Sequence, residues 1–380
     1  MNYNQWIAED LFVKIRWTAF IPDEGVAEYY IMAEILQPKQ SGKEQYNYMK
    51  QAIERLKEME AFKNIVFVTK RYFVSDAANQ HSRLCSPEEA AVSVVQQPPL
   101  NCTKLALLIY AVENATLYRE AAGTTVMKRP HYTHLYNTQL HEKNGDSHGQ
   151  TQAVFEQYLQ ALAEHGCTLE SHCLRTWIFV QNIDRQYKGM VQARKELFAK
   201  EGLTPQTHFI ASTGIEGRSI HPEVIVMMDA HAVQEIKREQ IRYLQASSHL
   251  NPTHEYGVTF ERGTCIQFGD RRHILISGTA SIDNRGEIVH LLQLEKQTER
   301  VVENITALLA EADADWPDVM HLIVYLRDIA DYENTRIYFE KNYPEIPFII
   351  LLAPVCRPGW LIEVECMAIK AITDDRFGEF

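Results

Sequence analysis

The sequence lacks several features that would assign it to a familiar class. None of its apolar runs approaches the roughly 20 residues that a membrane-spanning helix requires. Its seven cysteines are an odd number and show no Cys-x-x-Cys spacing, which predicts free thiols in a reducing compartment. The first residues, MNYNQWIAED, do not show the basic and then apolar pattern of a signal peptide. We therefore expect a cytoplasmic protein without a membrane partner.

Basic and glycine-rich segments are also scarce. The formal net charge is −12 and no long basic face is apparent, which argues against a nucleic-acid partner. No glycine-rich phosphate loop is present, so we expect no nucleotide cofactor. His131 and His134 have no cysteine or carboxylate close by in the sequence, so we expect no metal site there. Ser277 does not lie in a Gly-x-Ser-x-Gly motif, which argues against a serine hydrolase.

A repeated order of predicted elements is present instead. Alternating apolar residues predict strands, and apolar residues three or four apart predict helices. The third copy is the clearest, with strands at 256–268, 272–277, 320–326, 348–352 and 360–369, and helices at 296–311 and 332–342. Two earlier stretches repeat the order, although 77–87, where the first copy needs its second helix, resembles a loop. The order β-β-α-β-α-β-β predicts an α+β fold in which helices cover the outer face of each sheet.

The repeats divide the chain into three units and a linker. The predicted boundaries are 1–115 for a degenerate first unit, 116–235 for the second, 236–252 for a helical linker and 253–380 for the unit with the candidate site. Three such units in one chain predict either a monomeric pseudo-trimer or a homo-oligomer.

The segment Ala353–Lys370 contains most of the candidate chemistry. Its strand pattern places Glu363 and Glu365 on one face. Two carboxylates on an otherwise apolar strand are costly to bury unless they are paired or used. Cys356 and Arg357 precede the turn at Pro358. These residues predict either an active site or, more simply, an ion-paired strand with a small buried cysteine.

The third unit resembles the RidA/YjgF family, also called the endoribonuclease L-PSP family. The residues responsible are Ile276–Ile282, Gln297 and Asn304, Val324–Asp328 and Ile362–Ala368. With Arg175–Val180 and Ser212–Gly217 of the second unit, about two thirds of the chain is similar to the chorismatase branch of this family. The resemblance implies a cleft between units that takes a small carboxylated metabolite.

Chorismatases cleave the enolpyruvyl ether of chorismate with water, and this implies a role for each candidate residue. Glu363 would be the general acid, with Glu365 raising its pKa. Cys356 keeps the family's spacing of seven residues before that glutamate. The substrate-binding residues implied are Arg357, Arg218, Arg175, Tyr187, Thr279 and Ala280.

Two alternatives remain open at this point. RidA imine deaminases bind the substrate carboxylate with an arginine near the start of the penultimate strand, and the sequence has no arginine there, near Phe348 or Thr207. An imine deaminase is therefore disfavoured. A non-catalytic protein that binds a small metabolite in the same cleft is the other alternative. Ribonuclease activity, implied by the older family name, fits poorly with the net charge.

Overall fold

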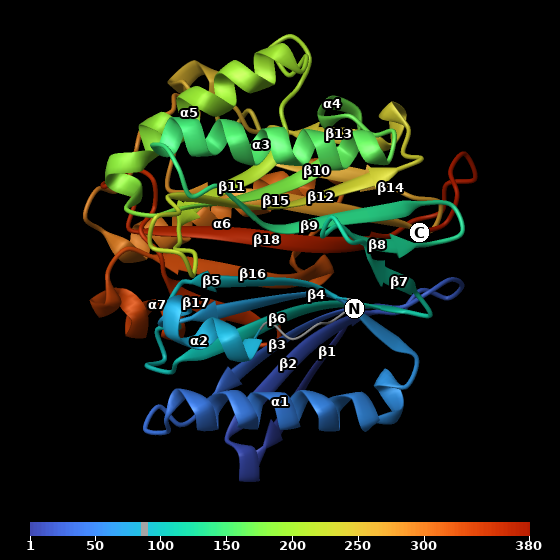
Figure 1. The fold of residues 1–380 in the computed structure, drawn as a ribbon, viewed down its shortest axis with the longest axis vertical. Coiled ribbons are helices and arrows are strands. Elements are labelled where there is room, and N and C mark those ends of the chain that lie inside the picture. The colour runs from blue at the N-terminus through green and yellow to red at the C-terminus, as the bar shows by residue number, and fades with distance from the viewer. Residues whose placement is uncertain (85–89) are drawn as a thin grey trace.

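Three six-stranded sheets form the interior of the protein (Figure 1). The computed structural model describes residues 1–84 and 90–380. The long helices α1, α3 and α5 lie on the outside of the molecule, and the sheets face one another. The predicted α+β fold with tandem units is thus confirmed. None of the described helices combines the length and apolar character needed to cross a membrane.

The first sheet has the strand order β1-β2-β3-β6-β4-β5. Its elements are β1 (Asn2–Ala8), β2 (Val13–Phe20), β3 (Glu28–Ile35), α1 (Gly42–Glu58), β4 (Ile65–Val74), α2 (Ala77–Leu84), β5 (Ala91–Gln96) and β6 (Leu105–Glu113). Helix α1 begins at a capping box in which the Ser41 side chain accepts from the Glu44 amide and the Glu44 carboxylate accepts from the Ser41 amide.

The second sheet has the order β11-β10-β12-β9-β8-β7 and the third has β13-β14-β15-β18-β16-β17. The second unit contains β7 (Thr116–Arg119), β8 (Thr125–Lys128), β9 (Thr133–His141), α3 (Ser147–Glu164), α4 (Leu169–His172), β10 (Cys173–Val180), α5 (Ile183–Lys200), β11 (Ala211–Glu216) and β12 (Val226–Gln234). The third contains β13 (Ile241–Leu244), β14 (Gly263–Gln267), β15 (Arg271–Ala280), α6 (Leu294–Glu311), β16 (Val319–Leu326), α7 (Tyr332–Asn342), β17 (Phe348–Leu352) and β18 (Ile362–Ala371).

Three differences from the predicted elements have physical causes. Each unit has an additional first strand (β1, β7 and β13), and β1 was missed because this edge strand is mostly exposed and alternates weakly. The predicted helix at 236–250 is wrong, because Ile241–Leu244 pairs with β14 and sheet pairing outweighs the local helical pattern. Residues 77–84 form α2 rather than a loop, and the end of that predicted loop, 85–87, lies outside the described residues.

Each unit contacts both of the other units through its strands. Strand β5 lies beside β9, β11 beside β15, and β16 beside β2. Each interface has a side-chain to main-chain hydrogen bond: Thr138 Oγ1 to Val92 O (2.8 Å), Ser212 N to Ser277 Oγ (2.9 Å) and Thr18 Oγ1 to Met320 O (2.8 Å). One chain therefore forms an arrangement that resembles a fused trimer, with three clefts between neighbouring units.

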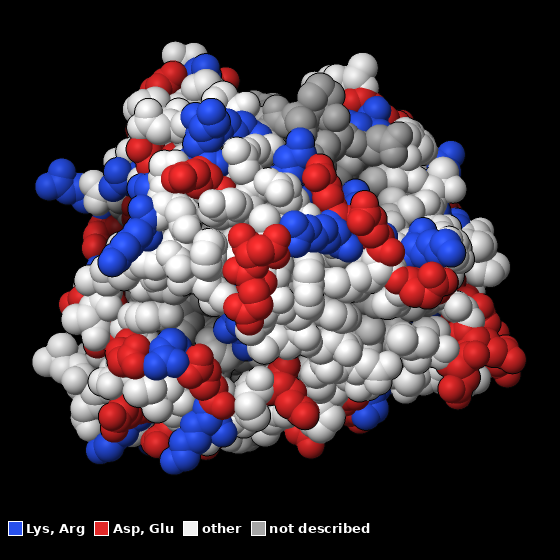
Figure 2. All heavy atoms as spheres, turned by 90° about the horizontal axis from the view of Figure 1, so that it is seen from below, with Lys and Arg blue, Asp and Glu red and all other residues white. Residues whose placement is uncertain are grey.

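Charged side chains are mixed over the surface. On the face that includes α1, lysine and arginine side chains lie among aspartates and glutamates (Figure 2). This distribution agrees with the acidic composition, and that face offers no continuous basic surface for a nucleic acid.

Candidate active site

A narrow cavity of about 40 Å³ lies between the second and third units. The second unit provides one wall from α5 and β11, and the third provides the opposite wall from β15, β18 and two loops. The lining residues include Tyr187, Arg194, Ser212, Gly214, Tyr256, Phe260, Arg262, Gly278, Ala280, Cys356, Arg357, Trp360 and Glu363.

Glu363 is the acidic residue of this cavity. It lies on β18, its side chain is 5% exposed, and its Oε1 has no hydrogen-bond partner among the described residues. Burial, followed by the nearby charge of Glu365, raises the pKa of Glu363 to about 8. The carboxyl group is therefore mostly protonated at neutral pH and can act as a general acid.

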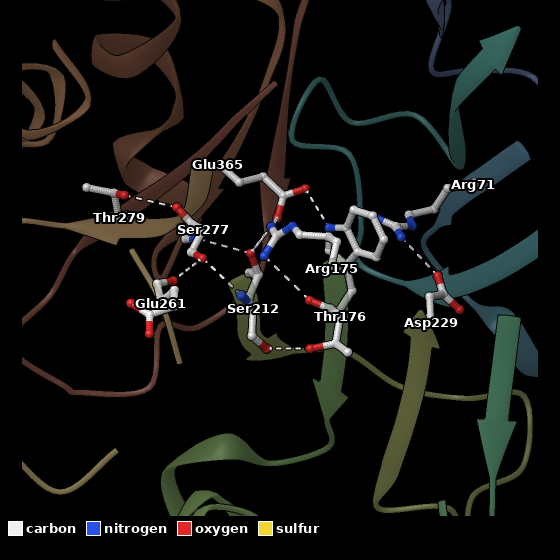
Figure 3. A network of polar contacts seen from close by, with 12 residues as sticks. Arg71, Arg175, Thr176, Ser212, Asp229, Glu261, Ser277, Thr279 and Glu365 are labelled. Carbon is white, nitrogen blue, oxygen red and sulfur yellow. Dashed lines mark hydrogen bonds and ion pairs between the residues drawn. The ribbon is translucent and has the colours of Figure 1, made fainter. Parts of the chain in front are cut away.

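Glu365 lies on the same face of β18 but faces away from the cavity. Its Oε1 accepts a hydrogen bond from Trp177 Nε1 (3.0 Å), and its Oε2 accepts from Thr213 Oγ1 (2.7 Å) and from Arg175 Nη2 (3.1 Å). Figure 3 shows the Arg175 guanidinium beside the Glu365 carboxylate. This buried ion pair keeps a negative charge near Glu363, while Arg175 limits the rise of the Glu363 pKa.

Gly278 provides the space that the Glu363 carboxyl group occupies. A β-bulge interrupts the pairing of β15 with β18 between Ile276 and Thr279, and the Gly278 amide donates to Thr213 Oγ1 (3.0 Å). A Cβ atom at position 278 would overlap the Glu363 carboxyl group. Glycine is therefore required here for close approach rather than for an unusual backbone angle.

Cys356 and Tyr187 meet at the other end of the cavity. Burial and the neighbouring Glu363 raise the pKa of the Cys356 thiol to about 12, and the thiol is hydrogen-bonded to Tyr187. Since the thiolate is the reactive form of cysteine, Cys356 is suited to shaping the cavity rather than to nucleophilic attack.

Six cysteines within the described residues are free thiols, as expected.

Three arginines face the cavity. The Arg357 guanidinium lies over the rings of Tyr256 (4.7 Å) and Trp360 (4.8 Å). Arg194 is 1% exposed, and its Nη2 has no partner in the part of the chain that the structure describes. Arg262 Nη2 donates to Asn251 O (3.0 Å). Guanidinium groups in such a site are suited to bind carboxylates.

Arg194 and Arg262 were missed by the sequence analysis. Arg194 lies on the face of α5 that also buries Met190, Ala193 and Leu197, so an arginine on a buried helix face was the available signal. Arg262 falls within the strand predicted at 256–268, but β14 begins only at Gly263, and Arg262 lies in the irregular segment before it.

The structure separates the predicted site residues into two groups. Those that line the cavity are Glu363, Cys356, Arg357, Tyr187 and Ala280. Four others do not line it. Arg175 and Glu365 pair with each other, Thr279 Oγ1 donates to Ser277 O (2.9 Å), and Arg218 is about half exposed beside Glu216. The sequence could not place Arg175, at the start of a strand, or Arg218, after a turn, because neither local pattern shows which side of a neighbouring unit a residue meets.

The other two clefts have no acid at the position of Glu363. In each unit the middle strand has a bulge, after which pairing resumes at Thr69, Arg175 or His321. The residue four positions later faces the last strand: Phe73 opposite Ala106, Phe179 opposite Met227, and Tyr325 opposite Glu363. Side chains also bridge the neighbouring units beside these positions. Gln139 hydrogen-bonds Val94 N (3.3 Å) and Val92 O (3.3 Å), and Arg16 Nη2 donates to Phe348 O (2.6 Å).

His134, at which no metal site was expected, lies close to His231. His134 Nδ1 lies 3.1 Å from His231 Nε2, and among the described residues no three His, Cys, Asp or Glu side chains are grouped as metal ligands would be.

Comparison with known proteins identifies the third unit. A model of the family described as endoribonuclease L-PSP matches residues 266–370. A RutC family protein of Pyrococcus abyssi is 36% identical over 100 residues, which are 26% of this chain and 78% of that protein. This chain belongs to the RutC/RidA family. Another RutC relative, the 3-aminoacrylate deaminase of Acinetobacter baylyi, is 31% identical over 98 residues, which are 25% of this chain and 77% of the deaminase.

A solved structure resembles this chain over more than one of its units. The crystal structure of a chorismatase superposes with a TM-score of 0.63 at 17% identity and covers 80% of this chain and 92% of the chorismatase chain. At this identity the similarity describes the fold. This RidA-family chain thus has a chorismatase-like fold, as its second and third units predicted.

Proposed function

We propose that the cleft between the second and third units hydrolyses the enolpyruvyl ether of chorismate or of a related small dicarboxylate. The observation that best supports this function is the protonated, buried Glu363 in a cavity lined by Arg194, Arg262 and Arg357. An acid that remains protonated at neutral pH is what protonation of an enol ether requires.

The reaction begins with proton transfer from Glu363 to the methylene carbon of the enolpyruvyl group. The resulting oxocarbenium carbon adds water, and the hemiketal that forms breaks its bond to the ring oxygen. Pyruvate and the ring alcohol are released, and the proton lost by the added water restores the Glu363 carboxyl group. The net reaction consumes one water molecule and needs no cofactor.

The arginines account for the two carboxylates of such a substrate. One carboxylate belongs to the enolpyruvyl group and the other to the ring, and each can be held by a guanidinium through paired hydrogen bonds. The cavity of about 40 Å³ is tight for a six-membered ring. We infer that Arg357 and the loop around it move when substrate enters, because the Arg357 guanidinium lies over two ring faces and makes a long hydrogen bond to the Gly286 carbonyl (3.4 Å).

Imine or enamine deamination is the second candidate, because one relative is a 3-aminoacrylate deaminase. Its substrate also accepts a proton on carbon, a step that Glu363 fits equally well. Strand β11, which borders the cleft, has no arginine from Ala211 to Glu216, and three arginines exceed what one carboxylate needs. These observations favour the dicarboxylate.

The test is incubation of the purified protein with chorismate, with pyruvate measured by a coupled assay and the ring product by mass spectrometry. We expect pyruvate release by the wild type and a loss of at least about 100-fold in Glu363→Gln. Glu295→Gln, an exposed glutamate of α6, serves as the matched control and is expected to retain activity.

Two results would contradict the proposal. Full pyruvate release by Glu363→Gln would remove this residue as the acid. Ammonia release from 3-aminoacrylate, without pyruvate release from chorismate, would favour the deaminase.

A further inference from the structure

A second and larger cavity lies at the centre of the molecule, where the three sheets meet. Its volume is about 100 Å³, and all three units contribute to its walls. The lining includes Arg71 and Ser93 from the first unit, Arg175 and His231 from the second, and His321 from the third. Glu363 and the three arginines of the cleft do not line it, although Arg175 and Glu365, which affect the pKa of Glu363, do.

Four buried side chains in this lining leave hydrogen-bonding atoms unused, and one of them is His134, through its Nε2. Arg71 Nε, Ser93 Oγ and His321 Nδ1 have no partner within residues 1–84 and 90–380, and these residues are 9%, 2% and 6% exposed. Arg71 and Ser93 are directly opposite each other on the paired strands β4 and β5. Buried polar atoms without partners are costly, so a bound molecule that supplied acceptors would stabilise this arrangement.

The acids next to the cavity are already engaged. Both oxygens of Asp229 accept hydrogen bonds, one from the backbone N–H of Gln139 (2.9 Å) and the other from Arg71 Nη2 (3.0 Å; Figure 3). Both oxygens of Glu365 accept from Trp177, Thr213 and Arg175, as described above. The atoms left without partners are therefore a guanidinium N–H, which always donates, and a hydroxyl and two imidazole nitrogens, all of which are able to donate.

The electrostatic environment also favours a negative ligand. The Arg71 and Arg175 guanidinium groups lie 4.3 and 4.9 Å from the Trp177 ring, so two buried cations share one indole. Burial, followed by the charges of Arg71 and Arg175, lowers the pKa of His321 to about 3. The positive charges of Arg71 and Arg175 therefore disfavour a further cation beside His321 and attract an anion there.

From this geometry we propose that the central cavity is a second binding site, for a small carboxylate or an oxyanion of similar size. The volume exceeds the roughly 10–15 Å³ that a single water molecule needs by several-fold, which allows a ligand of a few heavy atoms. The ligand would accept from Arg71 Nε, Ser93 Oγ and His321.

The experiment compares acetate with acetamide, which has nearly the same shape but no charge. Calorimetric titrations use the Arg357→Ala protein, in which anion binding in the cleft is weakened, and the same protein with Ser93→Ala or His321→Phe added. Ser93 has no hydrogen bond to lose, and phenylalanine keeps a ring against Tyr30, so both variants are expected to fold. We expect acetate to bind, acetamide to bind at least tenfold more weakly, and each added substitution to reduce acetate affinity at least tenfold.

A crystal structure of the protein with acetate locates the site directly. The proposal requires acetate in the central cavity, with an oxygen within hydrogen-bond distance of Arg71 Nε. Water alone in that cavity, equal affinity for acetate and acetamide, or acetate affinity that Ser93→Ala and His321→Phe leave unchanged would overturn it. If the protein does not hydrolyse chorismate, the proposed function fails but this test still stands, because the titration does not depend on turnover.

Discussion

At the scale of single residues, the pKa of Glu363 depends on neighbours with opposite effects. Burial and the charge of Glu365 raise it, while Arg175 and Arg262 lower it. Arg175 and Glu365 form one buried ion pair. The Glu365 carboxylate repels the charged form of Glu363, and the Arg175 guanidinium partly offsets that repulsion.

The raised pKa of Glu363 predicts a pH dependence of stability. The pKa is about 8 in the folded protein and near the model value of 4.5 when unfolded, so between these values the folded state holds a proton that the unfolded state has lost. Stability from this group is therefore fully present below about pH 4.5 and falls by at most about 1.4 kcal/mol per pH unit up to about pH 8.

Urea unfolding of the wild type and Glu363→Gln at pH 6 and pH 8 measures this effect. The variant, which cannot ionise, is expected to lose less stability than the wild type between the two pH values. Identical pH profiles for the two proteins would show that Glu363 is not buried as described.

The residues of the candidate site were only partly predictable. The period of two on the last strand identified the pair Glu363 and Glu365, because strand alternation depends on local backbone geometry. Arg194 and Arg262 could not be assigned to the cleft, because they reach it from a helix of one unit and an irregular segment of another.

At the scale of secondary-structure elements, the bulge on β15 and the position of β18 together form the site. The bulge turns Gly278 toward Thr213 of the neighbouring strand β11, and the resulting space receives the Glu363 carboxyl group. The equivalent bulge on β9 instead presents Gln139, which bonds across to β5 of the neighbouring unit.

We expect Gly278→Ala to lose most of its activity while remaining folded. The added methyl group must displace the Glu363 carboxyl group, and such overpacking typically costs about 1–3 kcal/mol of stability. Pyruvate release and the melting temperature measure the two effects. Gly149→Ala on α3 is the control, because its Cβ atom would make only ordinary contacts. A Gly278→Ala protein with wild-type turnover would show that Glu363 does not need its observed position.

At the scale of the whole molecule, the three clefts have diverged. Their last strands present Ala106, Met227 and Glu363 at corresponding positions, so one cleft has an acid and two do not. Fusion into one chain permits this, because each unit can change without changing the other two.

The fused arrangement predicts a particle of one chain. All three interfaces between units already form within the polypeptide, so no second copy is needed to complete the cleft. Light scattering after size-exclusion chromatography is expected to give a mass near 43.9 kDa. A stable trimer of chains would contradict this prediction.

The sequence by itself determined the order of strands and helices from β14 to β18, the tandem repetition and the shared face of Glu363 and Glu365. These features follow from periodicities of two and 3.6 residues, which depend on neighbours along the chain. Only the tertiary structure decided that Arg175 pairs with Glu365, that Arg194 and Arg262 face the cleft, and that Ile241–Leu244 is a strand. Each of these depends on contacts between segments far apart in sequence, and no local pattern records which segments meet.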